Sequence, residues 1–397
     1  MNTIFAKLKD DTNNEISVKI TGMVKGITGM TVTVSGISRG VGIGDKCYIL
    51  GKRGKVLAEA VGFEGEDVLL LPFGTWEGVS FGDKVEIHLA GDVIQPSYDW
   101  IGRTVNALGE PMDDYGFLPK GDVPYYIKNS PPNSFARKRV GEKLETKVKT
   151  FDVFTPVCRG QRMGIFAGSG VGKSSLLAML AKHTNADVVV IGLIGERGRE
   201  VQEFIQGDLG EEGMKKAVLV VSTSDEPSLM RRQAAWTATA VAEYFRDKGH
   251  HVLLMLDSVT RFAMAQREIG LSAGEPPTTK GYTPTVFAEL PRMLERSGPG
   301  TNSQGDITGL FTVLVDGDDH NEPISDAVRG ILDGHVVLDR KIADRGRYPA
   351  INISRSVSRM LPDSHGAEEN IVMKTAKTLI SSYEDMEELI KVGAYRQ

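Results

Sequence analysis

The chain has 397 residues, of which 41% are hydrophobic and 25% are charged, and its formal net charge is −5. This length exceeds what one compact core accommodates and predicts two or three domains of ordinary globular composition. The acidic balance argues against a nucleic-acid or anionic-membrane surface. The two cysteines, Cys47 and Cys158, form no CxxC motif and no His/Cys cluster, which argues against a zinc site or a disulfide framework and fits a reducing compartment.

The first residues contain no long apolar segment of the kind that a signal peptide needs. No apolar run reaches the ~18 residues of a membrane-spanning helix. We therefore expect a cytoplasmic protein whose association with a membrane, where it occurs, is peripheral.

Residues 1–95 show the pattern of an all-β domain. Apolar residues alternate with polar ones over residues 16–20 (ISVKI) and 30–34 (MTVTV), as in half-buried strands. Closely spaced glycines mark turns between such strands, at Gly22, Gly26, Gly29, Gly36, Gly40, Gly42 and Gly44. Short strands with frequent turn signals predict a small barrel.

Residues 95–150 are richer in proline and charge, and we interpret them as a connector that joins the next domain. The basic run from Arg137 to Arg139 is interpreted as a solvated turn rather than a binding patch, because short charge runs are usually exposed to water.

From Gln161 onward, apolar runs of strand length alternate with helical segments such as residues 227–246. The runs are residues 163–166, 186–194, 217–222, 252–257, 311–315 and 336–338. This order predicts a mainly parallel sheet with helices on both faces. After Pro362 the apolar spacing becomes helical, and we interpret the resulting stripe as a packing face, formed by Val372, Ala376, Leu379, Tyr383, Met386 and Ile390.

Residues 167–174 (AGSGVGKS) follow a strand and precede a helix, which is the context of a P-loop. The glycines let backbone N–H groups point at phosphates, Lys173 brings a charge to the β- and γ-phosphates, and the Ser174 hydroxyl binds Mg²⁺. The usual first glycine is replaced by Ala167, which is small enough to keep the loop short. The residues assigned to the nucleotide here are Ala167, Gly168, Ser169, Gly170, Val171, Gly172, Lys173, Ser174 and Ser175.

Two carboxylates complete the predicted chemistry. Asp257 ends the apolar strand 252–257, as the metal-binding aspartate of a P-loop ATPase does; the alternative is a cap of the next helix. Glu196 ends the strand 188–194, at the edge of the sheet where the γ-phosphate is expected, and is a candidate for orienting the attacking water. The alternative for Glu196 is a carboxylate stabilised at a helix start.

Longer motifs resemble the rotary ATPase family: the P-loop, GER at 195–197, DSVTRFAMAQRE at 257–268, GRYPA at 346–350 and SVSR at 356–359. Within this family the chain is most similar to the flagellum-specific ATPases of type III export. The phrases that carry this similarity are GLSAGEPP at 270–277 and VDGDDHNEP at 315–323. The resemblance runs from about residue 23 to the C-terminus.

The resemblance implies an α/β protein with three domains, assembled as a homo-hexamer. These are an N-terminal β-barrel at 1–95, a RecA-like ATPase domain at 96–350 and a C-terminal helical domain at 351–397. In the family this last domain continues past the motif at 392–397 (VGAYRQ), so we expect a shortened helical domain here, with consequences for ring stability and for docking of partners.

The resemblance also assigns roles to four residues. Glu196 matches the catalytic glutamate, and Arg197 follows it and supports the site. Tyr348 matches the aromatic residue that packs against adenine; the alternative is a core tyrosine before a proline turn. Arg359 matches the arginine finger that enters a neighbour's site.

The implied function is hydrolysis of ATP, with Mg²⁺, to energise flagellar type III protein export through chaperone release and unfolding of substrates. Implied partners are export regulator and stalk proteins, the export gate and chaperone–substrate complexes, at the inner face of the cytoplasmic membrane. The rivals are a virulence-type secretion ATPase, a catalytic subunit of ATP synthase and a hexameric RNA translocase. The translocase expects stacking aromatics and basic residues near the N-terminus, whereas residues 1–95 hold few aromatics and charges of mixed sign, so we expect no nucleic-acid partner.

Overall fold

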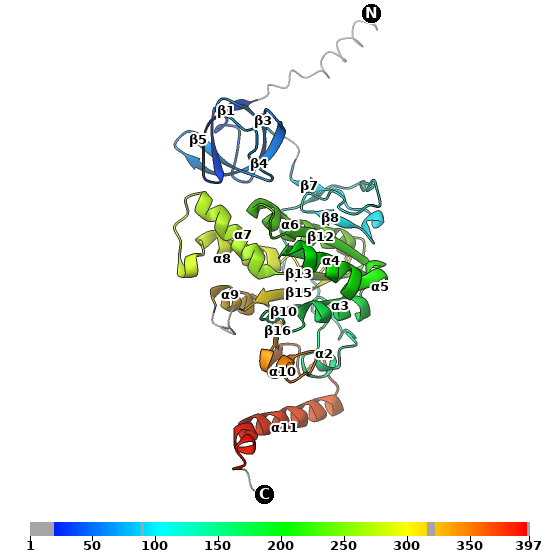
Figure 1. Cartoon of the computed structure of the whole chain (residues 1–397). Helices are drawn as coiled ribbons and strands as arrows, with labels where there is room; N and C mark the ends of the chain where they lie inside the picture. Colours follow the sequence, from blue (N-terminus) through cyan, green and yellow to red (C-terminus); the bar gives the residue numbers. More distant parts are fainter. Residues whose placement is uncertain (1–19, 89–90, 316–321, 395–397) are drawn as a thin grey trace, which may run out of the picture. The chain divides into compact units, whose positions relative to one another are not determined.

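The computed structural model describes residues 20–88, 91–315 and 322–394 (Figure 1). The chain divides into two compact units, residues 1–91 with 272–274, and residues 92–271 with 275–397. Three parts of the predicted motifs lie outside the described residues: the strand pattern at 16–19, residues 316–321 of VDGDDHNEP and residues 395–397 of VGAYRQ.

The first unit is a closed six-stranded barrel with the strand order β1-β2-β5-β4-β3-β6. Its strands are β1 (Thr21–Thr28), β2 (Thr31–Ser35), β3 (Lys46–Gly51), β4 (Gly54–Glu64), β5 (Asp67–Pro72) and β6 (Lys84–Ile87). Alternate residues of each strand point inward, so that Val32, Val34 and Ile49 are fully buried in the barrel core. The predicted N-terminal barrel is confirmed.

The second unit is built on a nine-stranded sheet with the order β17-β16-β10-β15-β13-β11-β12-β8, and β14 pairs with β15. Its strands are β8 (Thr104–Asn106), β10 (Arg162–Ala167), β11 (Val188–Glu196), β12 (Ala217–Thr223), β13 (His251–Asp257), β14 (Gly298–Pro299), β15 (Asp306–Leu314), β16 (Gly334–Leu338) and β17 (Ile351–Ser358). All pairings are parallel except those of β14 and β17. The predicted α/β architecture is confirmed, and the carboxyl ends of its parallel strands share one edge.

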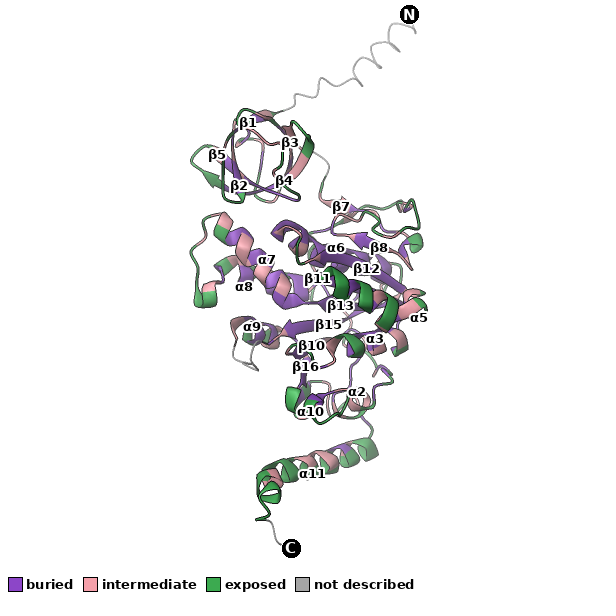
Figure 2. Cartoon of the chain, viewed as in Figure 1, coloured by how far each residue is buried: buried purple, intermediate pink, exposed green. Residues whose placement is uncertain are grey.

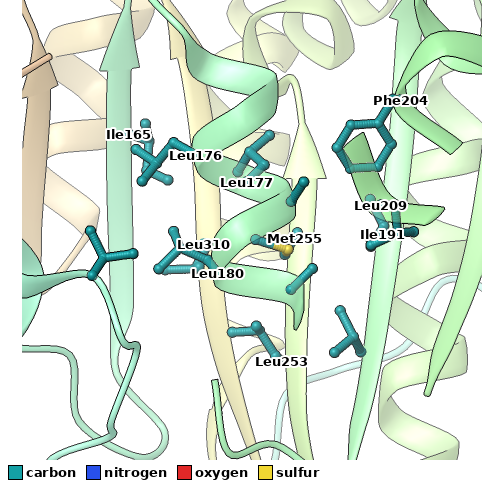
Figure 3. Packing of buried hydrophobic residues seen from close by; sticks show 14 of the residues in the cluster. Ile165, Leu176, Leu177, Leu180, Ile191, Phe204, Leu209, Leu253, Met255 and Leu310 are labelled. Carbon is teal, nitrogen blue, oxygen red and sulfur yellow. The ribbon is translucent and has the colours of Figure 1, made fainter. Parts of the chain in front are cut away.

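Helices cover both faces of this sheet. They include α2 (Lys149–Phe154), α3 (Lys173–His183), α4 (Gly198–Glu203), η2 (Phe204–Leu209), α5 (Gly210–Met214), α6 (Ser228–Asp247), α7 (Val259–Ser272), α8 (Pro284–Leu294), α9 (Pro323–Ile331), α10 (Arg340–Asp344) and the short turns η1 (Tyr98–Trp100) and η3 (Thr279–Gly281). On one face, α3 shares a core with the sheet, shown in Figure 3 by Ile165, Leu176, Leu177, Leu180, Met255 and Leu310. On the other face lies α6, whose Ala238 is so close to β11 that a Cβ on Gly192 would lie 3.1 Å from its Cβ.

The connector folds onto the second unit. Strands β7 (Val93–Ile94) and β9 (Tyr125–Tyr126) pair with each other, and β8 extends the main sheet. The prediction that Arg137–Arg139 is a solvated turn is wrong for its first two residues. The Arg137 guanidinium donates to the backbone oxygen of Glu295 at 2.6 Å. Lys138 Nζ lies 2.8 Å from the carboxylate of Asp306, the first residue of β15, and compensates its charge.

The C-terminal part differs from the expected boundary at residue 350. Residues 351–358 form β17 and pair with β16, and the helix α11 (Ala367–Lys391) follows. The interpretation of the stripe through Val372, Leu379 and Tyr383 as a packing face is wrong, because these side chains are exposed. Most of α11 has the colour of exposed residues in Figure 2. The helix packs instead on a face one residue away, where Met373 is buried and Glu387 pairs with Arg345. Within the described residues, no helix is long and apolar enough to cross a membrane.

One ion pair is buried completely. Arg296 donates to both carboxylate oxygens of Glu243, at 3.0 and 2.8 Å, and its third nitrogen donates to the Ile127 carbonyl at 2.6 Å. The side chains are 2% and 0% exposed. This pair joins α6, the segment after α8 and the connector, and each charge depends on the other because neither reaches water.

We expect Arg296→Met to lower the free energy of unfolding by about 3–5 kcal/mol, because it leaves the Glu243 carboxylate buried and unpaired. The matched control is Arg292→Met, which removes an exposed pair with Glu289 and should cost less than about 1 kcal/mol. Urea unfolding of both variants measures the difference. Equal losses would contradict a stabilising role for the buried pair.

Candidate nucleotide-binding site

The predicted P-loop lies between strand β10 and helix α3. Ala167 is the last residue of β10 and is 1% exposed, so the small side chain at this position is part of the core rather than of the loop. Helix α3 begins at Lys173, directly after Gly172, whose φ of +85° favours glycine. The free N–H groups of the first turn therefore face the same edge as the loop.

Lys173 lies between two carboxylates that come from neighbouring strands. Its Nζ is 2.6 Å from Oδ1 of Asp257, at the end of β13, and 3.2 Å from Oε1 of Glu196, at the end of β11. The strands are adjacent, with Leu193 paired to Asp257. The sheet register thus brings the three predicted residues together at its carboxyl edge.

Asp257 is held in place from a third strand. The Thr312 hydroxyl of β15 donates to Oδ1 of Asp257 at 2.7 Å, and its oxygen also lies 3.2 Å from the Leu256 carbonyl oxygen. The Asp257 residue is 4% exposed, so its carboxylate has little access to solvent. Thr312 and Lys173 therefore hold this carboxylate in one position beside the loop.

The electrostatics of the group follow from its burial. Burial alone would lower the pKa of Lys173, but the charges of Asp257 and Glu196 outweigh it and raise this pKa above the ordinary value of 10.5. Burial and the charge of Asp257 raise the pKa of Glu196 above 4.5, against the opposing effect of Lys173. Lys173 is therefore a permanent cation, and Glu196 holds a proton more readily than an ordinary glutamate.

A cavity of about 480 Å³ opens over these residues. It is lined by Ala167, Gly168, Ser169, Gly170, Gly172, Lys173, Ser174, Ser175, Gly195, Glu196, Arg197, Glu200, Ser224, Arg261, Leu314 and Val315. A narrow recess beside it brings Ser174, Glu196 and Asp257 together. The volume suits a small-molecule ligand, and the lining combines loop backbone with both signs of charge.

The remaining predicted residues occupy different positions. The Val171 side chain is 2% exposed and belongs to the core, so it offers backbone only. Ser175 donates to Asp208 at 3.4 Å, and the Arg197 side chain is 81% exposed and paired with Glu200 at 3.1 Å. Tyr348 is 61% exposed beside the loop: a Cβ on Gly172 would lie 3.4 Å from its ring.

Arg359 does not line the cavity of its own chain. It follows β17, which runs antiparallel to β16, and its N–H donates to the Asp333 carbonyl at 3.0 Å. Ser358 pairs with Gly334 at the start of β16, whereas Leu338 at the end of β16 pairs with Ala167. Arg359 is therefore at the edge of the sheet opposite the P-loop, and it is exposed.

Two charged residues of the cavity had no role in the sequence analysis. Arg261 lies in the quoted motif at 257–268, and its side chain packs over Gly195, where a Cβ would be 3.1 Å from the Arg261 Cβ. Gly195 has a φ of +68°, so a larger residue would disturb both the turn before Glu196 and the arginine. Glu200 lines the cavity and the recess and also raises the Glu196 pKa. The motif at 257–268 contained Arg261, but only the fold shows that this side chain lines the cavity.

The parallel sheet and the loop with its lysine and two strand-end carboxylates define a P-loop ATPase of the RecA-like class. Residues 147–358 match the nucleotide-binding domain of the ATP synthase alpha/beta family, and residues 24–87 match its beta-barrel domain. The chain belongs to this family.

Relatives cover nearly the whole chain. The "Flagellum-specific ATP synthase" of Caulobacter vibrioides is 56% identical over 95% of this chain and 86% of its own length. The protein of the same name from Bacillus subtilis is 51% identical over 96% and 86%. A solved structure of the assembled ATPase EscN with its central stalk EscO, from the enteropathogenic E. coli type III secretion system, has a TM-score of 0.86 at 39% identity and covers 95% of this chain and 89% of EscN.

The raised pKa of Glu196 predicts the pH dependence of ATP hydrolysis. If Glu196 orients the attacking water, as the sequence predicts, its carboxyl must be ionised. The value of kcat/KM should then be highest at high pH and fall, as the pH is lowered, at an apparent pKa above 4.5. Steady-state kinetics from pH 5 to 9 measure this acidic limb of the pH profile. As a control, Glu226→Gln removes another partly buried carboxyl with a raised pKa, which lies outside the cavity, and should leave the acidic limb of the pH profile in place. A limb that moves with Glu226→Gln would contradict the assignment to Glu196.

Proposed function

We propose that this ATPase hydrolyses MgATP to energise protein export through a flagellar type III apparatus. The observation that carries the proposal is the group at the sheet edge, in which Lys173 contacts both Glu196 and Asp257 beside the P-loop. The names of the two relatives, which are 56% and 51% identical, support the flagellar assignment. EscN, from the type III secretion system of enteropathogenic E. coli, is 39% identical, less than either of these relatives.

The residues at the recess fit a magnesium ion. Mg²⁺ prefers oxygen ligands, and the recess offers the Ser174 hydroxyl and the Asp257 carboxylate. Two carboxylates there share one ammonium group, so the local charge is negative before a nucleotide binds. Bound with ATP, the ion would neutralise charge on the phosphates.

The chain's own groups then account for hydrolysis. The loop N–H groups and the start of α3 bind the phosphates. The phosphates compete with both carboxylates for Lys173. Once Lys173 turns to the phosphates, Glu196 is free to orient water, and its raised pKa brings it closer to the operating pH. Arg197 and Arg261 line the cavity and bring positive charge toward the phosphates. Tyr348 stacks on the adenine ring in this proposal, and its position beside Gly172 supports that role.

The active form is a homo-hexamer in which Arg359 enters the site of a neighbouring subunit. Its position supports this, because Arg359 is exposed and lies at the opposite sheet edge from its own P-loop. Partners are a stalk protein, an export regulator, the export gate and chaperone–substrate complexes, and the complex works at the cytoplasmic face of the membrane. The assembled EscN with its central stalk supports both the assembly and the stalk.

We expect Glu196→Gln to bind ATP normally and to lose hydrolysis by about 10²–10⁴-fold, because the water loses its orienting carboxylate. Lys173→Ala should lose nucleotide binding as well. Single-turnover kinetics and equilibrium binding separate the two effects. If Glu196→Gln kept more than about a tenth of the wild-type kcat, its catalytic role would be excluded.

The same variant tests the cellular role. A strain carrying Glu196→Gln in place of the wild-type gene should export less hook and filament protein while secretion through any virulence apparatus is unchanged. Loss of virulence secretion with intact flagella would reverse the assignment.

Arg359 is tested by mixing subunits. Lys173→Ala subunits lack a working site but keep the finger, and Arg359→Ala subunits keep the site but lack the finger, so mixed rings should recover activity that neither variant shows alone. Arginine fingers contribute about 10³–10⁵-fold in kcat, so the recovery is easily measured. Absence of recovery in rings that demonstrably contain both variants would show that Arg359 does not act across the interface.

A further inference from the structure

An arginine outside the recognised motifs contacts the P-loop. Arg340, the first residue of α10, donates from Nη2 to the backbone oxygen of Ser169 at 3.0 Å, and the same nitrogen lies 3.4 Å from the Ser169 hydroxyl. Arg340 does not line the cavity, whereas Ser169 does. The guanidinium therefore contacts the loop from outside the cavity that the nucleotide would fill.

The sheet fixes the position of this arginine. Leu338 at the end of β16 pairs with Ala167 at the end of β10, so the segments that leave the two strands start side by side. Asp339 caps α10 through the Lys341 N–H at 2.9 Å, and its other oxygen accepts from Asn352 at 3.0 Å. The base of the Arg340 side chain is thus held two residues beyond the end of β16.

The contact has a consequence for the phosphate cradle because a peptide unit is planar and trans. The carbonyl of Ser169 and the N–H of Gly170 belong to one such unit and point in opposite directions. A guanidinium that holds this carbonyl on the outer side of the loop keeps the Gly170 N–H on the inner side. The positive charge also polarises the peptide, which strengthens that N–H as a donor to phosphate.

The same segment meets the loop a second time. Tyr348 follows α10, and its ring lies against Gly172, while Arg340 precedes the rest of α10 and contacts Ser169. The residues between them, 340–348, therefore span the loop from its tip to the start of α3. We propose that Arg340 is a positioning residue that holds the Ser169–Gly170 peptide in its phosphate-binding orientation; the inference rests on the proposed function, since it assumes that this loop binds the phosphates of ATP.

The test compares Arg340→Ala with Lys341→Ala. The Lys341→Ala substitution removes the same charge from the next position of α10. The Lys341 side chain is exposed and makes no hydrogen bond or ion pair with the described residues. Calorimetric titrations with MgADP and with the magnesium complex of a non-hydrolysable ATP analogue give both affinities for each variant, and thermal melting gives the stability.

We expect Arg340→Ala to weaken both ligands alike, by roughly 3- to 10-fold, since loop N–H groups cradle the phosphates that ADP and ATP share and one hydrogen bond is misplaced. The value of kcat at saturating ATP should change less than about 2-fold, because Arg340 does not touch the reacting atoms. Arg340→Lys should recover part of the affinity, since an ammonium can donate to the same carbonyl. Lys341→Ala should match the wild type.

Three results would overturn the inference. Equal affinities for Arg340→Ala and Lys341→Ala would show that the contact has no effect on the loop. A loss confined to the ATP analogue would make Arg340 a ligand of the γ-phosphate. A lowered melting temperature with unchanged affinities would make the role of Arg340 purely structural. If Arg340→Ala does not fold, the affinities of Arg340→Lys are measured in its place. Lys173→Ala serves as the reference: if it binds nucleotide normally, the proposed function itself fails, whereas loss of binding in Lys173→Ala alone affects only the role of Arg340.

Discussion

The contact of Lys173 with Asp257 and Glu196 is the interaction on which the rest of the site depends. Two carboxylates at the end of adjacent buried strands would repel each other in a medium that screens charge poorly. One ammonium group between them makes their proximity tolerable and keeps both side chains directed toward the loop. In the absence of phosphates, the lysine therefore stabilises the acidic edge of the sheet, and the phosphates of a bound nucleotide would compete with both carboxylates for it. The site is thus organised before a ligand arrives, at the cost of a competition for one cation.

This arrangement follows from the sheet rather than from any single motif. Each of three parallel strands ends in one part of the site at the same edge of the sheet. The loop follows β10, the buried aspartate ends β13 and the glutamate ends β11. Their interiors are nearly continuous runs of buried apolar residues, as expected for parallel strands covered on both faces. Thr312, a buried polar residue inside the sheet, holds the Asp257 carboxylate in place. The core therefore sets the distances in the site.

The sequence predicted the sheet, the barrel and the group at the P-loop because each has a local pattern: alternation, apolar runs ending in a carboxylate, and the glycine-rich loop. It did not predict the pairing of Arg137 and Lys138 with Glu295 and Asp306, because partners so distant in sequence have no local signal. The stripe on α11 was misassigned for a related reason. Apolar spacing identifies a helix, but the buried face is decided by what the helix meets, and here Glu387 pairs with Arg345 on that face. Arg340 had no motif, and its contact with Ser169 depends on the register of β16 with β10.

The two ends of strand β17 lie next to two different predicted site residues, Tyr348 and Arg359. Its start, at Ile351, follows the tyrosine beside the P-loop, and its end leads directly to Arg359 at the far edge of the sheet. The strand is irregular between Asn352 and Val357, so its eight residues lie along only the five residues of β16. Its two ends are therefore roughly 13 Å apart, the length of four steps along β16 at ~3.3 Å each. Backbone pairing joins both ends to β16, so a movement of β16 that shifts one end also shifts the other. In the proposed ring, this pairing would connect the pocket of one subunit to the surface that faces the next subunit without any flexible linker.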